Sequence, residues 1–253
     1  MKKNYLFLLI CLALYAPPLQ AQWLAGAGLQ VGIPAGDFAK NTNAVGIGVN
    51  VYALKALGPM VPIFVGIDGG YMMYGSTNNR FSQNITFLGT NIPLRYRVET
   101  TNNLINMHGV LRVAIPTSAV TIYLDGLVGF RYIYTRTTVK DDTPQRTVNV
   151  NSTTYTVNNQ TLGSRTNLSD FIFSYGGGGG FIFNVGNFKI DTRVVYLLGS
   201  EANYLDRDAV QQAPPPQFTQ SGTNINTSLE LDQYIKRSRT DMFFASVGLA
   251  LSF

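Results

Sequence analysis

The sequence has almost no residues that support thiol or imidazole chemistry. It contains one cysteine, Cys11, and one histidine, His108, in 253 residues. Cys11 falls in an N-terminal segment that we expect to be removed, so the mature chain should form no disulfide and use no thiolate. Any histidine-dependent catalysis would have to use His108. We therefore expect burial and hydrogen bonding alone to hold the fold together.

Charged residues and long apolar runs are also scarce. Asp, Glu, Lys and Arg make up 13% of the chain, and no stretch of the expected mature chain reaches the roughly 18 apolar residues that a membrane helix needs. The formal net charge of +5 falls to +3 when Lys2 and Lys3 are removed, which is too little to predict nucleic-acid binding. The composition excludes helical membrane spans and leaves a membrane barrel of strands open.

The N-terminal segment has the pattern of a secretory signal peptide. Lys2 and Lys3 form a basic start, Leu6–Tyr15 is apolar, and Ala21 ends a candidate cleavage site. We expect residues 1–21 to direct export and residues 22–253 to form the mature domain.

The stretch Val120–Thr137 indicates the surroundings of the mature chain. Side chains at alternate positions lie on the same face of a strand. One face of this stretch is apolar and ends in paired tyrosines, whereas the other face carries Asp125 and Arg131. An apolar face backed by isolated charges is typical of a transmembrane β-barrel strand, with lipid outside and a narrow polar lumen inside.

The same alternation recurs along the chain and predicts an all-β protein, an eight-stranded antiparallel transmembrane up-and-down β-barrel. Short connections alternate with longer ones, which is the asymmetry of such barrels. Both termini should then be periplasmic, and the long extracellular loops, chiefly residues 140–169 and 201–239, should lie in water. The expected strands are Trp23–Ile33, Val45–Lys55, Ile63–Tyr74, Asn106–Ile115, Val120–Thr137, Asp170–Val185, Phe188–Leu198 and Met242–Phe253.

Residues 75–103 leave the number of strands open. Ser76–Asn79 has the composition of a loop, whereas Asn91–Glu99 could be a strand with a poor lipid face. We interpret the segment as a long outer loop leading into a tall fourth strand, which gives eight strands. A full hairpin over Asn84–Glu99 would give ten.

The C-terminal segment resembles the assembly signal of bacterial outer-membrane β-barrels. FFASVGLALSF ends in Phe253 and has apolar residues, including Leu251 and Leu249, at every second position before it. HGVLRVAIP, YLDGLVGFRYIYTRT and DTRVVYLLGSEANYL also resemble segments of small outer-membrane barrels of the Bacteroidota, of the OmpA- and OmpX-like porin-family type. The resemblance implies an outer-membrane location, contact with outer-membrane lipid and insertion by the barrel-assembly machinery. It implies no shared activity.

Inward-facing charges on several strands predict a plug in the lumen. The bore of an eight-stranded barrel is narrow enough for side chains to fill, so an arginine on one wall can reach a carboxylate on another. We expect the acids and arginines to pair and to leave no continuous pore. The glycine run Gly176–Gly180 would suit a place where the wall bends or an opposing bulky side chain approaches. The expected cluster is Asp68, Arg112, Asp125, Asp191 and Arg193, with Arg131 and His108 higher in the lumen as candidate extensions.

The sequence contains little that indicates catalysis or metal binding. We interpret His108 as a structural lumen residue, because parity places it inside the barrel and away from the loops. No group of His, Cys or acids has zinc-ligand spacing. Basic residues just above the outer end of the last strand could contact lipid phosphates or be ordinary loop charges, and loop acids could hold calcium weakly or be solvated. These residues are Lys236, Arg237 and Arg239, and Asp141, Asp142, Glu201, Asp206 and Asp208.

The favoured hypothesis is a monomeric, non-enzymatic outer-membrane barrel with no cofactor, no metal and no nucleic-acid partner. Its loops, residues 140–169 and 201–239, would contact an unidentified surface ligand. A narrow porin-like channel for small solutes is the main alternative, and an enzyme built at the mouth of the loops is a second one.

Overall fold

The computed structural model describes most of the chain after the expected signal peptide. The described residues are 23–42, 44–58, 61–87, 90–116, 120–142, 146–150, 153–157, 161–185, 188–205, 217–221, 224–228 and 232–252. The expected signal peptide, Phe253, Asp206 and Asp208 lie outside these ranges, so the expectations about them stay predictions.

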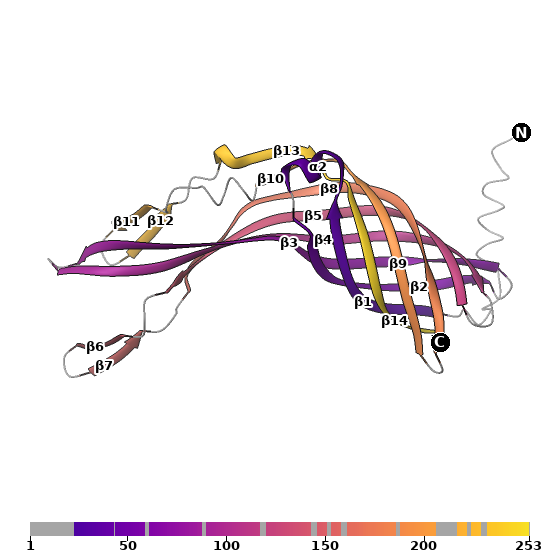
Figure 1. The fold of residues 1–253 in the computed structure, drawn as a ribbon, viewed down its shortest axis with the longest axis horizontal. Coiled ribbons are helices and arrows are strands. Elements are labelled where there is room, and N and C mark those ends of the chain that lie inside the picture. The colour runs from indigo at the N-terminus through magenta and orange to yellow at the C-terminus, as the bar shows by residue number, and fades with distance from the viewer. Residues whose placement is uncertain are drawn as a thin grey trace, which may run out of the picture.

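The described chain forms a closed antiparallel β-barrel (Figure 1), with the strand order β1-β14-β9-β8-β5-β4-β3-β2. Because β1 pairs with both β2 and β14, the barrel has no open edge. The predicted eight-stranded all-β fold is confirmed, and the ten-strand alternative is wrong. The barrel strands are β1 (Trp23–Pro34), β2 (Gly46–Gly58), β3 (Val61–Phe87), β4 (Thr90–Pro116), β5 (Val120–Asp141), β8 (Thr161–Val185), β9 (Phe188–Gly199) and β14 (Met242–Ser252).

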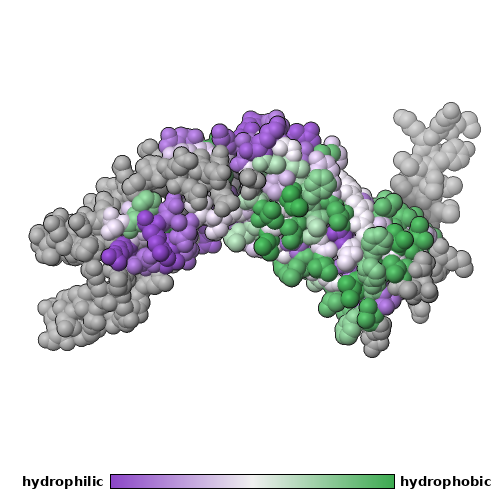
Figure 2. All heavy atoms as spheres, viewed as in Figure 1, coloured by the Kyte–Doolittle hydropathy of each residue, from purple (hydrophilic) through white to green (hydrophobic). Residues whose placement is uncertain are grey.

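Outward side chains of the barrel form an apolar belt. Leu29, Ile47 and Leu124 are 65%, 69% and 68% exposed, and similar residues alternate with inward ones along every barrel strand. Figure 2 shows apolar residues gathered over the barrel wall and hydrophilic ones over the regions beyond it. An exposed apolar surface of this extent fits hydrocarbon better than water. None of the described helices is long and apolar enough to cross a membrane.

The interpretation of residues 75–103 as a long loop is wrong. β3 and β4 each have 27 residues and pair continuously from Gly75 opposite Asn102 to Phe87 opposite Thr90. A strand in water needs backbone partners but no apolar face. The polar composition of Ser76–Asn79 therefore gave no sign that β3 continues through these residues. β5 and β8 also extend beyond the belt. We call this part the projecting sheet (Figure 1): β3 Gly75–Phe87, β4 Thr90–Asn102, β5 Thr135–Asp141 and β8 Thr161–Leu168.

The two segments expected to be loops also contain strands. Residues 140–169 include the end of β5, the start of β8 and a separate hairpin, and residues 201–239 include a second hairpin and a two-stranded sheet of β10 and β13. These strands are held by local backbone pairing. Because their residues do not alternate between apolar and polar, the sequence did not predict them. The smaller elements are α2 (Gly36–Asn41), β6 (Arg146–Val150) with β7 (Thr153–Val157), β10 (Glu201–Leu205) with β13 (Ile235–Arg239), β11 (Gln217–Ser221) with β12 (Asn224–Ser228), and the short 3-10 helix η1 (Asp232–Tyr234).

The two ends of the described barrel lie together. Leu24 near the start of β1 pairs with Ser252 at the end of β14, at the end of the barrel where β2 and β3, β4 and β5, and β8 and β9 are joined by short connections. The projecting sheet extends from the opposite end (Figure 1). We call these the short-turn end and the projecting end.

Candidate functional site: a lumen closed at two levels

An arginine and an aspartate on neighbouring strands form the centre of the lumen. The register of β4 and β5 places Arg112 directly opposite Asp125, with both side chains inward. Arg112 Nε donates to Asp125 Oδ1 at 2.7 Å, and Arg112 Nη2 donates to Asp125 Oδ2 at 2.9 Å. The pair is bidentate, the strongest geometry for these two groups. It is also buried, since Arg112 is 0% and Asp125 5% exposed.

A second arginine links this pair to the far wall. Arg193 on β9 approaches Asp125 with Nε 2.8 Å from Oδ2, and its Nη1 lies 2.5 Å from Oδ2 of Asp68 on β3. Asp125 thus receives both arginines, and Arg193 spans the bore to Asp68. All of these side chains are buried, so the chain of ion pairs fills the lumen at this depth.

The third acid, Asp191, is held mainly by tyrosine hydroxyls. Tyr52 Oη donates to its Oδ2 and Tyr123 Oη donates to its Oδ1, both at 2.6 Å. Arg112 Nη1 lies farther away, 3.9 Å from Asp191 Oδ2. The structure therefore brings all five residues expected in the cluster together and adds Tyr52 and Tyr123, which sequence reasoning missed. Their inward parity was the available signal.

Both tyrosine rings also hold the guanidinium of Arg112. The Cζ atom of Arg112 lies 3.6 Å from the ring centroid of Tyr123 and 4.9 Å from that of Tyr52. Stacking on aromatic faces suits the planar arginine group. We call the seven residues the ionic cluster: Tyr52, Asp68, Arg112, Tyr123, Asp125, Asp191 and Arg193.

Two glycines make room for these rings. A Cβ atom on Gly26 would lie 2.5 Å from Cζ of Tyr52, and one on Gly180 would lie 2.4 Å from Oη of Tyr123. Gly180 is the last residue of the glycine run and is paired directly with Tyr123 on β5. The structure thus places a bulky side chain against this end of the run, as the sequence interpretation allowed.

The two candidate extensions lie higher and do not join the ionic cluster. His108 Nε2 is 2.6 Å from Ser174 Oγ, and the Arg131 guanidinium, 0% exposed, has no hydrogen bond to another described residue. A histidine beside a serine can be a base and a nucleophile. Here both side chains are at most 1% exposed, and His108 Nδ1 has no described partner that would orient the ring. The pair fits a structural role better than a catalytic one.

A polar layer lies next to the ionic cluster, on the side of the projecting end. Gln30, Asn50 and Asn106, together with Asp68 and Arg193, border a cavity of about 20 Å³. A polar cavity of this size has room for about one water. It is too small to make an open path.

A second closure lies at the projecting end of the lumen. Phe38 of α2 is 0% exposed, and its ring centroid is 5.6 Å from that of Tyr74 and 4.9 Å from that of Tyr204 on β10. Asn41 Nδ2 also donates to Tyr204 Oη at 3.0 Å, and the amide of Ala35 donates to the carbonyl oxygen of Asp241 at 2.8 Å. Figure 1 shows α2, β10 and β13 grouped together. We call the Phe38, Tyr74 and Tyr204 contact the aromatic lid.

The basic residues expected near lipid phosphates lie on β13 and next to acids. Arg237 Nε is 3.1 Å from Glu201 Oε2, and Arg239 Nη2 is 3.5 Å from Asp241 Oδ1. Lys236 pairs through its backbone with Tyr204. Two of the three basic side chains therefore lie beside acids on an exposed strand, and contact with lipid phosphate stays a prediction.

The acids considered for calcium are spread over different elements. Asp141 ends β5 and is buried, so its assignment to a loop is wrong. Asp142 contacts Arg97 and Arg80, whereas Glu201 lies on β10. In the part of the chain that is described, no three His, Cys, Asp or Glu residues are arranged to hold a metal ion.

The described end of the expected assembly signal lies in the barrel wall. Leu249 and Leu251 are 57% and 53% exposed and pair with Ala27 and Ala25 of β1. Both side chains belong to the apolar belt, and β14 closes the barrel.

No protein-family model and no curated protein matches the chain. Several solved structures of outer-membrane proteins are similar to it in architecture. Neisserial surface protein A is 9% identical, with a TM-score of 0.39 and coverage of 91% of this chain and 97% of that one. Ail of Yersinia pestis is 14% identical, with a TM-score of 0.35 and coverage of 92% and 99%. A major outer membrane protein of Thermus thermophilus is 11% identical, with a TM-score of 0.44 and coverage of 90% and 99%. These low values leave the functional argument to the geometry of this chain.

Proposed function

We propose that the protein is a monomeric, non-enzymatic outer-membrane barrel with a closed lumen, which contacts a ligand outside the cell through its projecting parts. The observation that carries the proposal is the double closure of the lumen, by the ionic cluster and by the aromatic lid. A transport role needs a continuous polar path, whereas the buried ion pairs fill the lumen at their depth and the cavity on their projecting side has a volume of about 20 Å³.

The outer-membrane location is supported by three features of the chain. The apolar belt surrounds the barrel, the N-terminal residues have the pattern of a signal peptide, and the residues before Phe253 alternate as in an assembly signal. A closed barrel also satisfies all its backbone groups within hydrocarbon. In this location the short-turn end faces the periplasm, and the projecting end faces the outside.

The projecting sheet is a suitable contact surface because its outward face is polar and ordered by charge pairs. Lys140 Nζ lies 2.6 Å from Glu99 Oε2, and Arg97 Nη1 lies 3.6 Å from Glu99 Oε1. Asp142 accepts a hydrogen bond from Arg97, which lowers the pKa of the Asp142 carboxyl. The Asp142 charge therefore persists as the pH falls below the usual range of an aspartate. Such a surface presents fixed charges to a partner in water.

Planar-bilayer recordings test the closed lumen. We expect the purified protein to show no steady conductance. Steady conductance in the wild type that Asp125→Ala leaves unchanged would reject the closure and favour the porin-like channel.

A pull-down tests the contact role. We expect intact cells or envelope extracts to retain a ligand that a variant lacking residues 143–160 loses. That deletion removes the β6–β7 hairpin and keeps the paired ends of β5 and β8. A variant lacking residues 217–228, the β11–β12 hairpin, tests the second projecting segment in the same way, and equal retention by the wild type and both variants would count against the role of these hairpins.

A further inference from the structure

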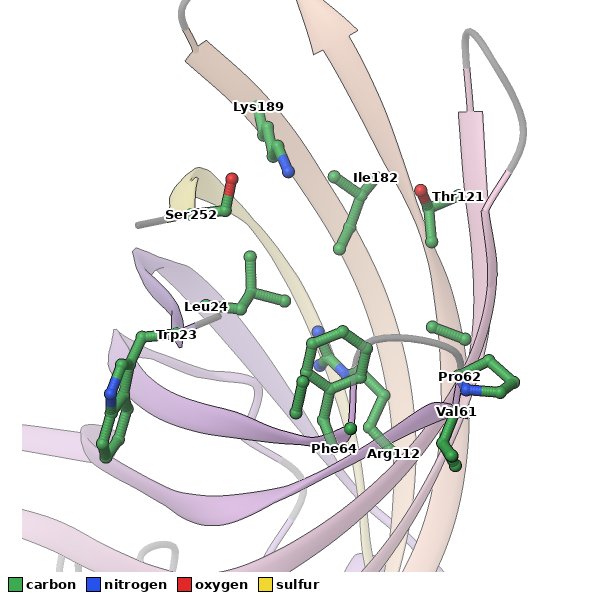
Figure 3. Close-up of a pocket in the computed structure, with 13 residues that line it drawn as sticks. Trp23, Leu24, Val61, Pro62, Phe64, Arg112, Thr121, Ile182, Lys189 and Ser252 are labelled. Carbon is green, nitrogen blue, oxygen red and sulfur yellow. The ribbon is translucent and has the colours of Figure 1, made fainter. Parts of the chain in front are cut away.

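The short-turn end of the lumen holds a cavity that the proposed function does not use. Its volume is about 250 Å³, and it is lined by residues from the barrel strands. Figure 3 shows Leu24, Phe64, Ile182 and Lys189 pointing toward the same space, with Arg112 beside Phe64. Since Arg112 belongs to the ionic cluster, the cluster forms the floor. We call this cavity the vestibule.

The lining of the vestibule is apolar with two cations. Leu24, Phe64 and Ile182 form apolar walls, and the small side chains of Ala56 and Ala114 leave space between them. Arg112 and Lys189 are the charged residues of the described lining, and none of the described lining residues carries a carboxylate. A mostly apolar cavity with a few convergent polar groups is the usual composition of a small-molecule site.

Both cations have hydrogen-bonding capacity left over. Arg112 is 0% exposed, yet its Nη1 has no hydrogen-bond partner and stands 3.9 Å from Asp191. Lys189, on the inward face of β9 two residues before Asp191, makes no ion pair with a described residue. A buried donor without a partner, such as Arg112 Nη1, is costly, whereas Lys189 is half-buried. An anion entering the vestibule would supply the missing acceptor.

We propose that the vestibule binds a medium-chain organic carboxylate. The carboxylate lies between Lys189 Nζ and Arg112 Nη1, and the hydrocarbon tail packs against Leu24, Phe64 and Ile182. A small inorganic anion would leave the apolar walls uncovered, a neutral lipid would leave the cations without acceptors, and an amine would be repelled. The site opens at the short-turn end and does not depend on the ligand of the projecting sheet.

Octanoate is a suitable probe, because it is water-soluble and carries both chemical features. Its affinity is measured by ligand-observed NMR, with the barrel in nanodiscs of zwitterionic lipid and empty nanodiscs as the background. We expect saturable binding of octanoate and binding of octan-1-ol at least about tenfold weaker, because the alcohol lacks the charge-assisted hydrogen bonds. Equal affinities for the two compounds, or no binding of octanoate at millimolar concentration, would overturn the proposal.

Matched lysine variants locate the anion. Lys189→Gln removes the cation inside the vestibule and should weaken octanoate binding by about tenfold. Lys55→Gln removes a cation at the same end of the barrel but on the outer surface, where Lys55 Nζ lies 5.8 Å from the ring centroid of Trp23, and should leave the affinity unchanged. An equal loss in both variants would show surface adsorption and reject the vestibule as the site.

A variant that fills the cavity gives an independent measurement. Ala56→Leu adds side-chain volume to the vestibule without changing charge, and it should abolish octanoate binding while the folded band on an unboiled gel persists. Undiminished binding in a folded Ala56→Leu barrel would reject the site. Bilayer conductance is recorded on the same samples, so a failure of ligand binding is distinguished from a failure of lumen closure.

Discussion

Asp125 is the residue on which the ionic cluster depends most. It accepts hydrogen bonds from Arg112 and approaches Arg193 as well. Removing it leaves two buried guanidinium groups short of an acceptor. A buried charge that loses its partner typically costs about 3–5 kcal/mol. We therefore expect Asp125→Ala to lower the free energy of unfolding by about that amount, measured by urea-dependent loss of the folded gel band.

The control for this prediction has to be an exposed acid whose ion pair is also exposed. Asp141, a loop residue by sequence, is unsuitable because it is buried at the end of β5. Asp37 is exposed and contacts Lys40 at 2.7 Å, so Asp37→Ala should leave the urea midpoint unchanged. Equal shifts for Asp125→Ala and Asp37→Ala would contradict the structural role of the ionic cluster.

The hydroxyl groups of Tyr52 and Tyr123 make a smaller contribution to the free energy of unfolding, which can be measured separately. Tyr123→Phe keeps the ring beneath Arg112 and removes one donor to Asp191, and a hydrogen bond to a charged group contributes about 1.5–3 kcal/mol. We expect Tyr123→Phe to lower the free energy of unfolding in urea by that amount. The double variant with Tyr52→Phe should lose more than the sum of the two single variants, because Asp191 then has neither hydroxyl donor. Tyr132→Phe on the outer wall is the control. Strict additivity would mean that the two hydroxyls act independently.

The sequence alone is enough to place the acids and arginines of the ionic cluster on the inner face. Alternation along Val120–Thr137 fixes the face of Asp125, and the same logic fixes Asp68 and Asp191. Parity could not show that Tyr52 and Tyr123 stack on an arginine. That depends on which glycine the register sets beside each ring, Gly26 and Gly180, and the register becomes known only when all hairpins are in place.

At the scale of elements, the projecting sheet shows where alternation stops being informative. Ser76 and Asn78 are exposed, and buried Thr77 lies opposite Thr100, so no apolar period marks Ser76–Asn79 as a strand. Its pairing with β4 still satisfies the backbone. Within the belt, by contrast, hydrocarbon on one side forces every second residue to be apolar, and the strand positions followed from the sequence.

The aromatic lid can be separated from the ionic cluster by mutation. Phe38→Ala removes the ring between Tyr74 and Tyr204, a change that typically costs about 3–5 kcal/mol in a packed site. We expect hydrogen exchange in α2 to speed up while the bilayer stays non-conducting, because the ionic cluster is intact. Combining Phe38→Ala with Asp125→Ala should produce conductance. A double variant that folds and stays closed would show that another part of the lumen forms the seal.

The whole molecule should behave as an outer-membrane protein that assembles through its C-terminal strand. We expect it to fractionate with the outer membrane and to migrate differently on gels before and after boiling, because a closed barrel resists detergent. Deletion of Phe253 should reduce assembly. Undiminished assembly without Phe253 would contradict the assembly-signal interpretation.

The orientation of the barrel can be tested by proteolysis of intact cells. The proposed orientation puts the segments 143–160 and 206–231 outside, so added protease should cut there first. Lys140 is paired with Glu99 and Asp142 with Arg97, and the residues before position 143 should therefore be protected. Cleavage confined to Gly58–Pro62 at the short-turn end would show the opposite orientation.

The extra residue in β3 has a consequence for how this protein can change over evolutionary time. Met73 pairs with Asn103 and Gly75 with Asn102, so Tyr74 has no counterpart on β4 and enters the aromatic lid. Because the bulge absorbs Tyr74, the pairing beyond it keeps its register, and Arg80 lies opposite Arg97 on the outward face. A further single-residue insertion in the paired stretch, if no new bulge absorbed it, would turn every residue beyond it to the other face. Lineages descended from this chain should therefore vary in length mainly at the tip of the hairpin, and length changes within the paired stretch should come in even numbers or bring a new bulge.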